Sequence, residues 1–339
     1  MAAAKRISHA NTSSPYSSGY KASKKPRSAV TQLTSLFLLL ILLFPITVVR
    51  GLSGQQQRLK QGSSLSVENL NNLLVSPKGT FSSGFYKVGK NAYCFSIWFT
   101  NSFDKTVVWI ANRDNPVNGK NSRLTIHGNG NLALTDGDGS TVWSTNTFLE
   151  SGEEVRLLET GNLVLTNKAG RIIWESFKFP TDTLLALQPL TKNTTLVSAR
   201  NQGKFLSGFY NLKFDDNNVL NLVYNGPQIS SVYWPSNIVN VFDSGRTPYN
   251  STRRAILHED GRFASSDNLI FNASDSGARL NRRLTLDHDG VVRLYSLDES
   301  TGLWNISWQP GGLNTCLVHG LCEHMPFALI KPKNHLHLP

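Results

Sequence analysis

GNLALTDGDGSTVW at residues 130–143 returns as GNLVLTNKAGRIIW at residues 161–174, a spacing of 31 residues. Both segments open with Gly-Asn-Leu, continue with alternating aliphatic residues and end on an aliphatic-Trp pair. A further Val-Trp pair at residues 108–109 lies 34 residues before the first of these tryptophans. Three units that each end in a tryptophan predict a module with pseudo-threefold symmetry. We expect its three indoles, those of Trp109, Trp143 and Trp174, to meet near the axis.

A longer repeat lies over this one. FSSGFY at residues 81–86 returns as FLSGFY at residues 205–210, which are 124 residues further on, so the whole module is predicted to be duplicated. Short runs of alternating apolar residues, separated by Gly, Asn and Asp, indicate β-strands throughout, and no stretch after Gly51 has sustained helical periodicity. Representative predicted strands cover residues 94–99, 106–110, 132–134, 163–165 and 219–224.

The second copy is less regular than the first. Residues 219–224 and 292–295 are its clearest strands, and its candidate core indoles are those of Trp234, Trp304 and Trp308. A Pro-Thr-Asp turn after Phe179 favours a boundary there. The predicted domains are a leader at 1–51, the first module at 55–178, the second module at 179–309 and a C-terminal region at 310–339.

Positive charge is concentrated at the N-terminus. The formal net charge is +11, but seven of the 34 basic residues lie within residues 1–51, which leaves 27 basic residues against 23 acidic ones in the rest of the chain. A balance this even does not form the basic stripe that tracks phosphates, so we expect no nucleic-acid partner.

An apolar segment follows the basic residues. Residues 28–49 carry no charge and include LFLLLILLF at residues 36–44. This pattern predicts either a cleaved signal peptide or an uncleaved anchor, and both place the chain after Gly51 on the exported side of the membrane. We therefore expect a secreted or plasma-membrane-associated protein, held by the N-terminal segment if it is not cleaved.

Two further features fit export. Asn-x-Ser/Thr sequons predict N-glycosylation at Asn193, Asn250, Asn272 and Asn305. The three cysteines are too few for a disulfide framework, and their odd number leaves at least one unpaired or paired outside this chain. Stability is therefore expected to come from β-sheet cores.

The sequence resembles the bulb-type (mannose-binding) lectin and S-locus glycoprotein ectodomains of plant G-type lectin S-receptor-like serine/threonine kinases over residues 60–325. The resemblance rests on WIANRDNP at residues 109–116, VWSTN at 142–146, WESF at 174–177 and PTDTLL at 180–185, with SVYWP at 231–235 and RLTLD at 283–287 in the second module. It implies an all-β chain of two tandem β-prism modules. It also makes Cys316 and Cys322 disulfide candidates at the start of an EGF-like region.

The resemblance also places a carbohydrate site. The family pattern Gln-x-Asp-x-Asn-x-Val-x-Tyr puts five side chains on one strand face. Here the corresponding residues in one repeat are His127, Asn129, Asn131, Ala133 and Thr135, and those in the next are Leu158, Thr160, Asn162, Val164 and Thr166. The first set keeps three polar groups but lacks the carboxylate, the Val and the phenol. We expect a degenerate mannose site there and a weaker one in the other repeat.

No catalytic site is predicted. The adjacent carboxylates of Asp136/Asp138, Glu153/Glu154 and Asp215/Asp216 lie in turn-like segments and do not suggest the paired acids of a glycosidase. A zinc site could be built from two cysteines and two histidines near the C-terminus, namely Cys316, His319, Cys322 and His324. Export from the cell favours a disulfide between the cysteines instead. The sequence carries no kinase signatures, so we expect neither enzymatic activity, cofactor nor metal.

Recognition outside the cell is the function that these features favour. The ligand would be a glycan, another extracellular molecule or a second receptor ectodomain in a homo- or hetero-dimer, with the parent family's roles in pollen recognition or defence signalling. The alternatives are a structural, dimerisation or decoy ectodomain that binds no sugar, or a fragment of a longer receptor kinase.

Overall fold

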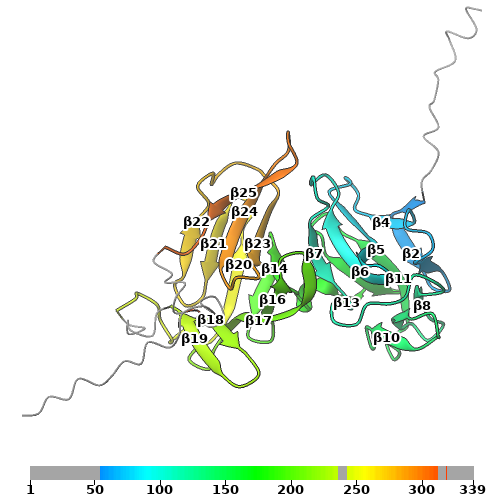
Figure 1. The fold of residues 1–339 in the computed structure, drawn as a ribbon, viewed down its shortest axis with the longest axis horizontal. Coiled ribbons are helices and arrows are strands. Elements are labelled where there is room, and N and C mark those ends of the chain that lie inside the picture. Colours follow the sequence, from blue (N-terminus) through cyan, green and yellow to red (C-terminus); the bar gives the residue numbers. More distant parts are fainter. Residues whose placement is uncertain (1–53, 236–242, 312–317, 319–339) are drawn as a thin grey trace, which may run out of the picture. The chain divides into compact units, whose positions relative to one another are not determined.

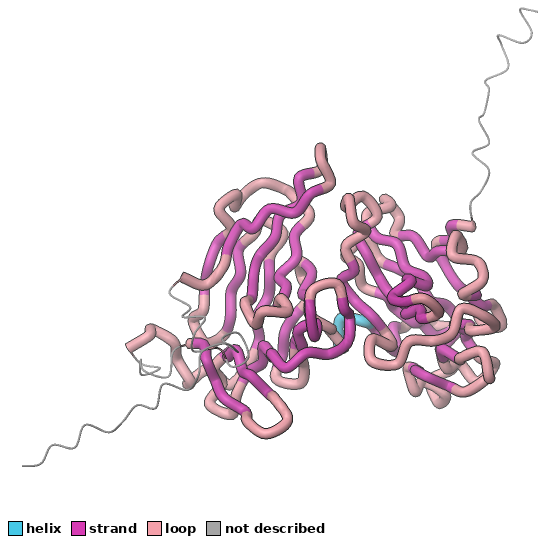
Figure 2. Tube along the Cα trace, viewed as in Figure 1, coloured by secondary structure: helices cyan, strands magenta, loops and turns pink. Residues whose placement is uncertain are grey.

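The structure is a computed structural model, and it describes residues 54–235, 243–311 and 318. Strands make up nearly all of its regular structure, and the single cyan turn in Figure 2 is the 3-10 helix η1, Ser176–Lys178. No helix in these residues is long and apolar enough to span a membrane. The predicted leader at residues 1–51 and the candidate disulfide Cys316–Cys322 lie outside the described residues.

Three sheets form the first module, which can be followed from blue to green in Figure 1. The first sheet has the order β1-β4-β5-β6-β7, the second β10-β9-β8-β3 and the third β13-β12-β11-β2. The strands are β1 (Gln55–Gln56), β2 (Arg58–Lys60), β3 (Ser64–Ser66), β4 (Leu73–Val75), β5 (Phe81–Gly89), β6 (Ala92–Phe99), β7 (Val107–Ile110), β8 (Arg123–Ile126), β9 (Leu132–Thr135), β10 (Thr141–Ser144), β11 (Gly152–Leu157), β12 (Leu163–Asn167) and β13 (Ile172–Glu175).

Three further four-stranded sheets form the second module: β16-β17-β18-β19, β15-β20-β21-β22 and β14-β23-β24-β25. The strands are β14 (Thr183–Leu185), β15 (Pro189–Thr191), β16 (Leu196–Asn201), β17 (Lys204–Phe214), β18 (Leu220–Asn225), β19 (Ser230–Trp234), β20 (Arg254–Leu257), β21 (Arg262–Ser265), β22 (Ile270–Asn272), β23 (Arg282–Leu286), β24 (Val292–Asp298) and β25 (Leu303–Trp308).

The two modules share one topology. In the first, the successive short strands β2, β3 and β4 join the third, second and first sheets in that order. In the second, β14, β15 and β16 join its third, second and first sheets in the same reversed order. The repeated segments at 81–86 and 205–210 lie on β5 and β17, the equivalent first long strands. The predicted duplication of an all-β module is therefore confirmed, while the exact limits at residues 178 and 179 stay a prediction.

Alternation along the strands supplies the core. On β9, Leu132 and Leu134 are completely buried, and on β8 Leu124 and Ile126 pair with them and are also completely buried. Because successive side chains of a strand point to opposite faces, each sheet presents one aliphatic face to the interior of its module. Two separate clusters of buried hydrophobic residues result, one within each module.

The three indoles of the first module meet as predicted. Trp109, Trp143 and Trp174 lie on β7, β10 and β13, the last strand of each sheet. Their ring centroids are 6.0, 6.0 and 5.5 Å apart, and all three pairs meet edge to face. Edge-to-face packing places the positive ring edge against the negative face of its neighbour. The pseudo-threefold symmetry is thus built into the core.

One core prediction for the second module is wrong. Trp234 and Trp308 do pack against its core, but the third aromatic is Phe271, which stacks on Trp308 at 3.5 Å. Trp304 instead packs on Phe99 and donates a hydrogen bond of 2.6 Å to Thr106. Trp304 faces away from the second core because the pairing of β24 with β25 contains a register shift.

That shift explains why two tryptophans at an even spacing face opposite sides. Trp308 pairs with Leu294 on the core face, whereas Trp304 pairs with Leu297, an odd number of residues further along β24. A bulge between Leu294 and Tyr295 adds one residue to β25, and one extra residue moves every following side chain to the other face.

Candidate functional site

The candidate carbohydrate site is a hairpin turn followed by a strand in the second sheet of the first module. The His127 amide donates to the Asn131 carbonyl at 2.9 Å, and the Gly130 amide donates to the His127 carbonyl at 2.9 Å. Gly130 has φ of +84°, and a Cβ there would lie 2.2 Å from the Gly152 nitrogen. The glycine of each Gly-Asn-Leu repeat is therefore required by the turn, because Gly161 also has φ of +82°.

The five site residues do not form one continuous strand face. β9 begins at Leu132, so Ala133 and Thr135 lie on the strand, whereas His127, Asn129 and Asn131 belong to the turn before it. His127 and Asn129 are exposed, and Ala133 is buried at 2% exposure. The structure thus divides the five residues between the turn and the strand, and between exposed and buried positions.

The Asn131 side chain forms hydrogen bonds within the protein through its Oδ1 atom but not through its Nδ2 atom. Its Oδ1 accepts hydrogen bonds of 3.1 Å from both the Thr145 hydroxyl and the Thr147 amide, which ties the end of β10 to the turn. No hydrogen bond from its Nδ2 occurs within residues 54–235, 243–311 and 318. The face therefore keeps one free amide donor, together with the exposed His127 and Asn129.

The equivalent asparagine in the third sheet forms hydrogen bonds at both ends of its side-chain amide. Asn162 Oδ1 accepts from the Ser176 hydroxyl and the Phe177 amide, both at 3.2 Å, and its Nδ2 donates to Glu175 at 2.9 Å. Leu158 and Thr160 supply no carboxylate or amide beside it. Fewer polar groups are therefore open on this face than on the second sheet, and the expectation of a weaker mannose site here stays a prediction.

Charged side chains cover the other end of the third-sheet face. Glu154 forms ion pairs with Arg58 at 3.4 Å and with Arg156 at 2.6 Å. Beside them a polar cavity of about 390 Å³ extends past Thr166 to Lys60. Thr166 stands where the family has tyrosine, so no phenol ring lies over this region.

Two of the three carboxylate pairs lie in turns, as expected, whereas Glu153 and Glu154 lie on strand β11, where the expectation of a turn is wrong. Asp136 accepts hydrogen bonds from the Asn118 and Gly137 amides and from the Ser122 hydroxyl. These bonds outweigh the opposing effect of desolvation and lower the pKa of Asp136. Asp215 binds the Val219 amide in the same way, at 2.9 Å. Within the described part of the chain, no group of three or more His, Cys, Asp or Glu is arranged to hold a metal ion.

A related polar face in the second module was missed by sequence reasoning. The Asp287 amide donates to the Val291 carbonyl at 3.0 Å and the Gly290 amide to the Asp287 carbonyl at 2.9 Å, which repeats the turn at His127. This equivalence places Asp287, Asp289, Val291, Arg293 and Tyr295 where His127 to Thr135 stand. An Asp-Gly dipeptide with polar residues spaced by two was the available signal.

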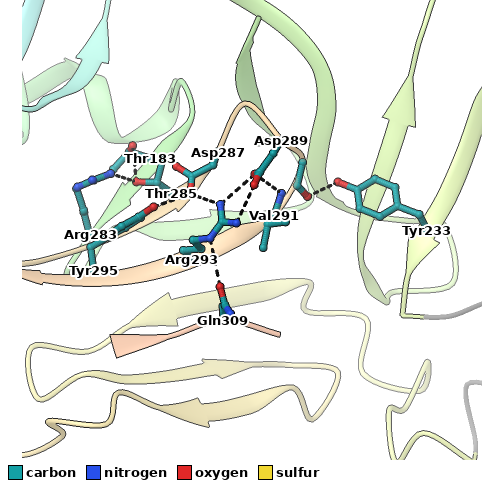
Figure 3. A network of polar contacts seen from close by, with 11 residues as sticks. Thr183, Tyr233, Arg283, Thr285, Asp287, Asp289, Val291, Arg293, Tyr295 and Gln309 are labelled. Carbon is teal, nitrogen blue, oxygen red and sulfur yellow. Dashed lines mark hydrogen bonds and ion pairs between the residues drawn. The ribbon is translucent and has the colours of Figure 1, made fainter. Parts of the chain in front are cut away.

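The polar side chains on this face of the second module form hydrogen bonds with one another, as Figure 3 shows. Arg293 donates to Asp287 at 2.6 Å and to Asp289 at 2.7 Å, and the Tyr295 hydroxyl donates to Asp287 at 2.6 Å. The hydrogen bond to Asp289 is the main reason that the pKa of Arg293 is raised. Both carboxylates are therefore committed to the protein's own guanidinium.

The comparisons with known proteins agree with this geometry. The family model described as D-mannose binding lectin matches residues 106–203. A putative receptor protein kinase from Zea mays is 42% identical over 88% of this chain, which spans 37% of that protein. An S-locus-specific glycoprotein from Brassica oleracea is 29% identical over 86% of this chain, which spans 67% of that protein.

A solved monomeric mannose-binding lectin from Gastrodia elata aligns with a TM-score of 0.29 and 22% identity over 36% of this chain and 96% of that one. The fold assignment rests instead on the paired three-sheet modules and the indole triad of the chain itself. Residues 106–203 therefore belong to a bulb-type lectin domain, and the chain as a whole is similar to plant S-domain receptor-like kinases and to an S-locus-specific glycoprotein.

Proposed function

We propose that this chain is an extracellular recognition ectodomain with a residual carbohydrate site on the turn and strand from His127 to Thr135. The observation that supports this choice is the difference in side-chain hydrogen bonding between the two equivalent asparagines. Asn131 keeps a free Nδ2 beside two exposed polar residues, whereas both ends of the Asn162 amide are used within the protein. A sugar hydroxyl can therefore find a donor at the second sheet.

Affinity for a single mannose is expected to be low. The site lacks the carboxylate that accepts from adjacent sugar hydroxyls and the phenol that adds another contact. Each missing partner costs on the order of 1–3 kcal/mol when a buried polar group is left unpaired. We expect a dissociation constant for free mannose no lower than about 1 mM, which corresponds to roughly −4 kcal/mol.

Restoring the family pattern tests this site. The chain carrying His127→Gln, Asn129→Asp, Ala133→Val and Thr135→Tyr should bind mannose more tightly than the natural chain in titration calorimetry. The matched control is Leu158→Gln, Thr160→Asp and Thr166→Tyr in the third sheet, where both ends of the Asn162 amide already form hydrogen bonds, and it should gain less.

Two results would contradict the proposed site. Micromolar binding of mannose by the natural chain would show that the present residues suffice, and no gain from the four restorations would show that the face is not a sugar site. Melting curves of each variant are needed alongside, because Ala133 is nearly fully covered and valine is larger.

The biological role that we propose is cell-surface or secreted recognition, including recognition of pollen or defence signalling. The similarity to an S-locus-specific glycoprotein supports it. Association with a receptor ectodomain that is unaffected by added mannose would instead favour the dimerisation or decoy role. Mixing the purified chain with candidate ectodomains in analytical ultracentrifugation, with and without mannose, distinguishes the two.

A further inference from the structure

A mainly apolar cavity of about 400 Å³ lies in the segment that links the last strand of the first module to the first strands of the second. All of its lining residues fall between positions 175 and 194, and they include Phe177, Phe179 and Pro189. An open apolar hollow of this kind, outside the core, needs an explanation.

Phe179 forms a rigid wall of this cavity. Phe179 is 56% exposed as a residue, and its ring stacks on Trp174 with centroids 5.8 Å apart and an interplanar angle of 9°. Its amide donates to the Ser176 carbonyl at 2.9 Å, and its carbonyl accepts from the Trp109 indole at 2.8 Å. Stacking on Trp174 and the two backbone hydrogen bonds hold the ring in place. The exposed part of the ring is therefore a preformed flat surface for another group.

Asn193 also lines this cavity. It is exposed, it opens the sequon Asn193-Thr194-Thr195, and its side-chain amide makes no hydrogen bond within the described residues. The turn that carries it is fixed, because the Thr194 hydroxyl accepts from the Thr191 amide at 2.7 Å. A sugar attached to this side chain therefore starts at the rim of the cavity.

We propose that the first N-acetylglucosamine of a glycan on Asn193 lies in this cavity against Phe179. Attachment joins Asn193 Nδ2 to C1 of the sugar, while the lipid diphosphate of the glycan donor leaves and the amide loses a proton. The C–H face and acetyl methyl of the sugar then cover the phenyl ring, and its hydroxyls point to water. The proposal uses the predicted glycosylation and does not depend on the mannose face.

The chain offers its own controls. Asn250, Asn272 and Asn305 also carry sequons and are exposed, but none of them lines this cavity. Glycans at those positions are expected to project into solvent, with little effect on folding stability. A stabilising effect confined to Asn193 is therefore the specific signature of the proposed contact.

Melting temperatures of the full chain, secreted from a plant or insect host, provide the test. Glycopeptide mass spectrometry first establishes occupancy at each sequon. Asn193→Gln should lower the melting temperature by about 2–4 °C, whereas Asn272→Gln should leave it unchanged. Enzymatic trimming of the glycans to one N-acetylglucosamine should keep the stability of the intact glycoprotein.

A double-mutant cycle separates the contact from general effects of the glycan. In a Phe179→Ala background, the further change Asn193→Gln should no longer lower the melting temperature. An unglycosylated Asn193 in a chain whose other sequons are occupied would overturn the proposal, as would a stabilisation that persists without Phe179. Self-association of the wild-type glycoprotein that Phe179→Ala abolishes would assign the cavity to a second copy instead.

Discussion

Truncation of the indole triad is the sharpest test of the fold. Trp109 and Trp174 are buried at 5% and 7% exposure, and each meets two other indoles. Two aromatic pairs contribute about 1–3 kcal/mol beyond area burial, and the whole Trp→Ala change costs about 3–5 kcal/mol. Trp109 additionally loses its 2.8 Å hydrogen bond to the Phe179 carbonyl, worth roughly 0.5–1.5 kcal/mol. Trp143 is only partly buried, so its truncation should cost least.

Urea unfolding, followed by the fluorescence of the six remaining tryptophans, measures these losses. With a slope near 2–3 kcal/mol per molar urea, the midpoint of Trp109→Ala should fall by about 1–2 M. Phe103→Ala is the control: Phe103 is 82% exposed, so this substitution should leave the midpoint unchanged. Wild-type midpoints for all three indole variants would refute a core organised around the triad.

Three other expectations follow from buried or paired groups. Arg246→Ala should cost about 3–5 kcal/mol in urea unfolding, because it leaves the fully buried Asp267 carboxylate without its cation; a loss below 1 kcal/mol would contradict this. Hydrogen bonds from Arg293 and the Val291 amide outweigh desolvation and lower the pKa of Asp289 in the folded chain. The contribution of this carboxylate to stability is therefore present above the unfolded pKa near 4 and is lost as pH falls through the lower folded value. Asp289→Asn should accordingly make the free energy of unfolding depend less on pH in the acid range. Burial is the main cause that raises the pKa of Cys94 to about 12, so mass spectrometry after iodoacetamide treatment at pH 8 should find it unmodified in the folded chain and modified in urea.

The sequence by itself determined the repeated parts of this protein. The Gly-Asn-Leu and Trp spacings predicted three equivalent units and a central indole triad, because each repeat encodes the same tight turn and the same alternation of buried side chains. The longer repeat predicted the second module for the same reason. Local rules of this kind act over a few residues and can be read directly from the chain.

The tertiary structure decided features that depend on register and on contacts between distant strands. A single bulge in β25 turns Trp304 to the face opposite Trp308, although their even spacing suggested that both face the core, and Phe271 on β22 of another sheet supplies the third core aromatic. The hydrogen bonds that Thr145 and Thr147 donate to the side-chain Oδ1 of Asn131 likewise depend on how β10 returns to β9. A one-residue change in register reverses the side of the sheet that a side chain faces, and composition or spacing alone does not reveal that change.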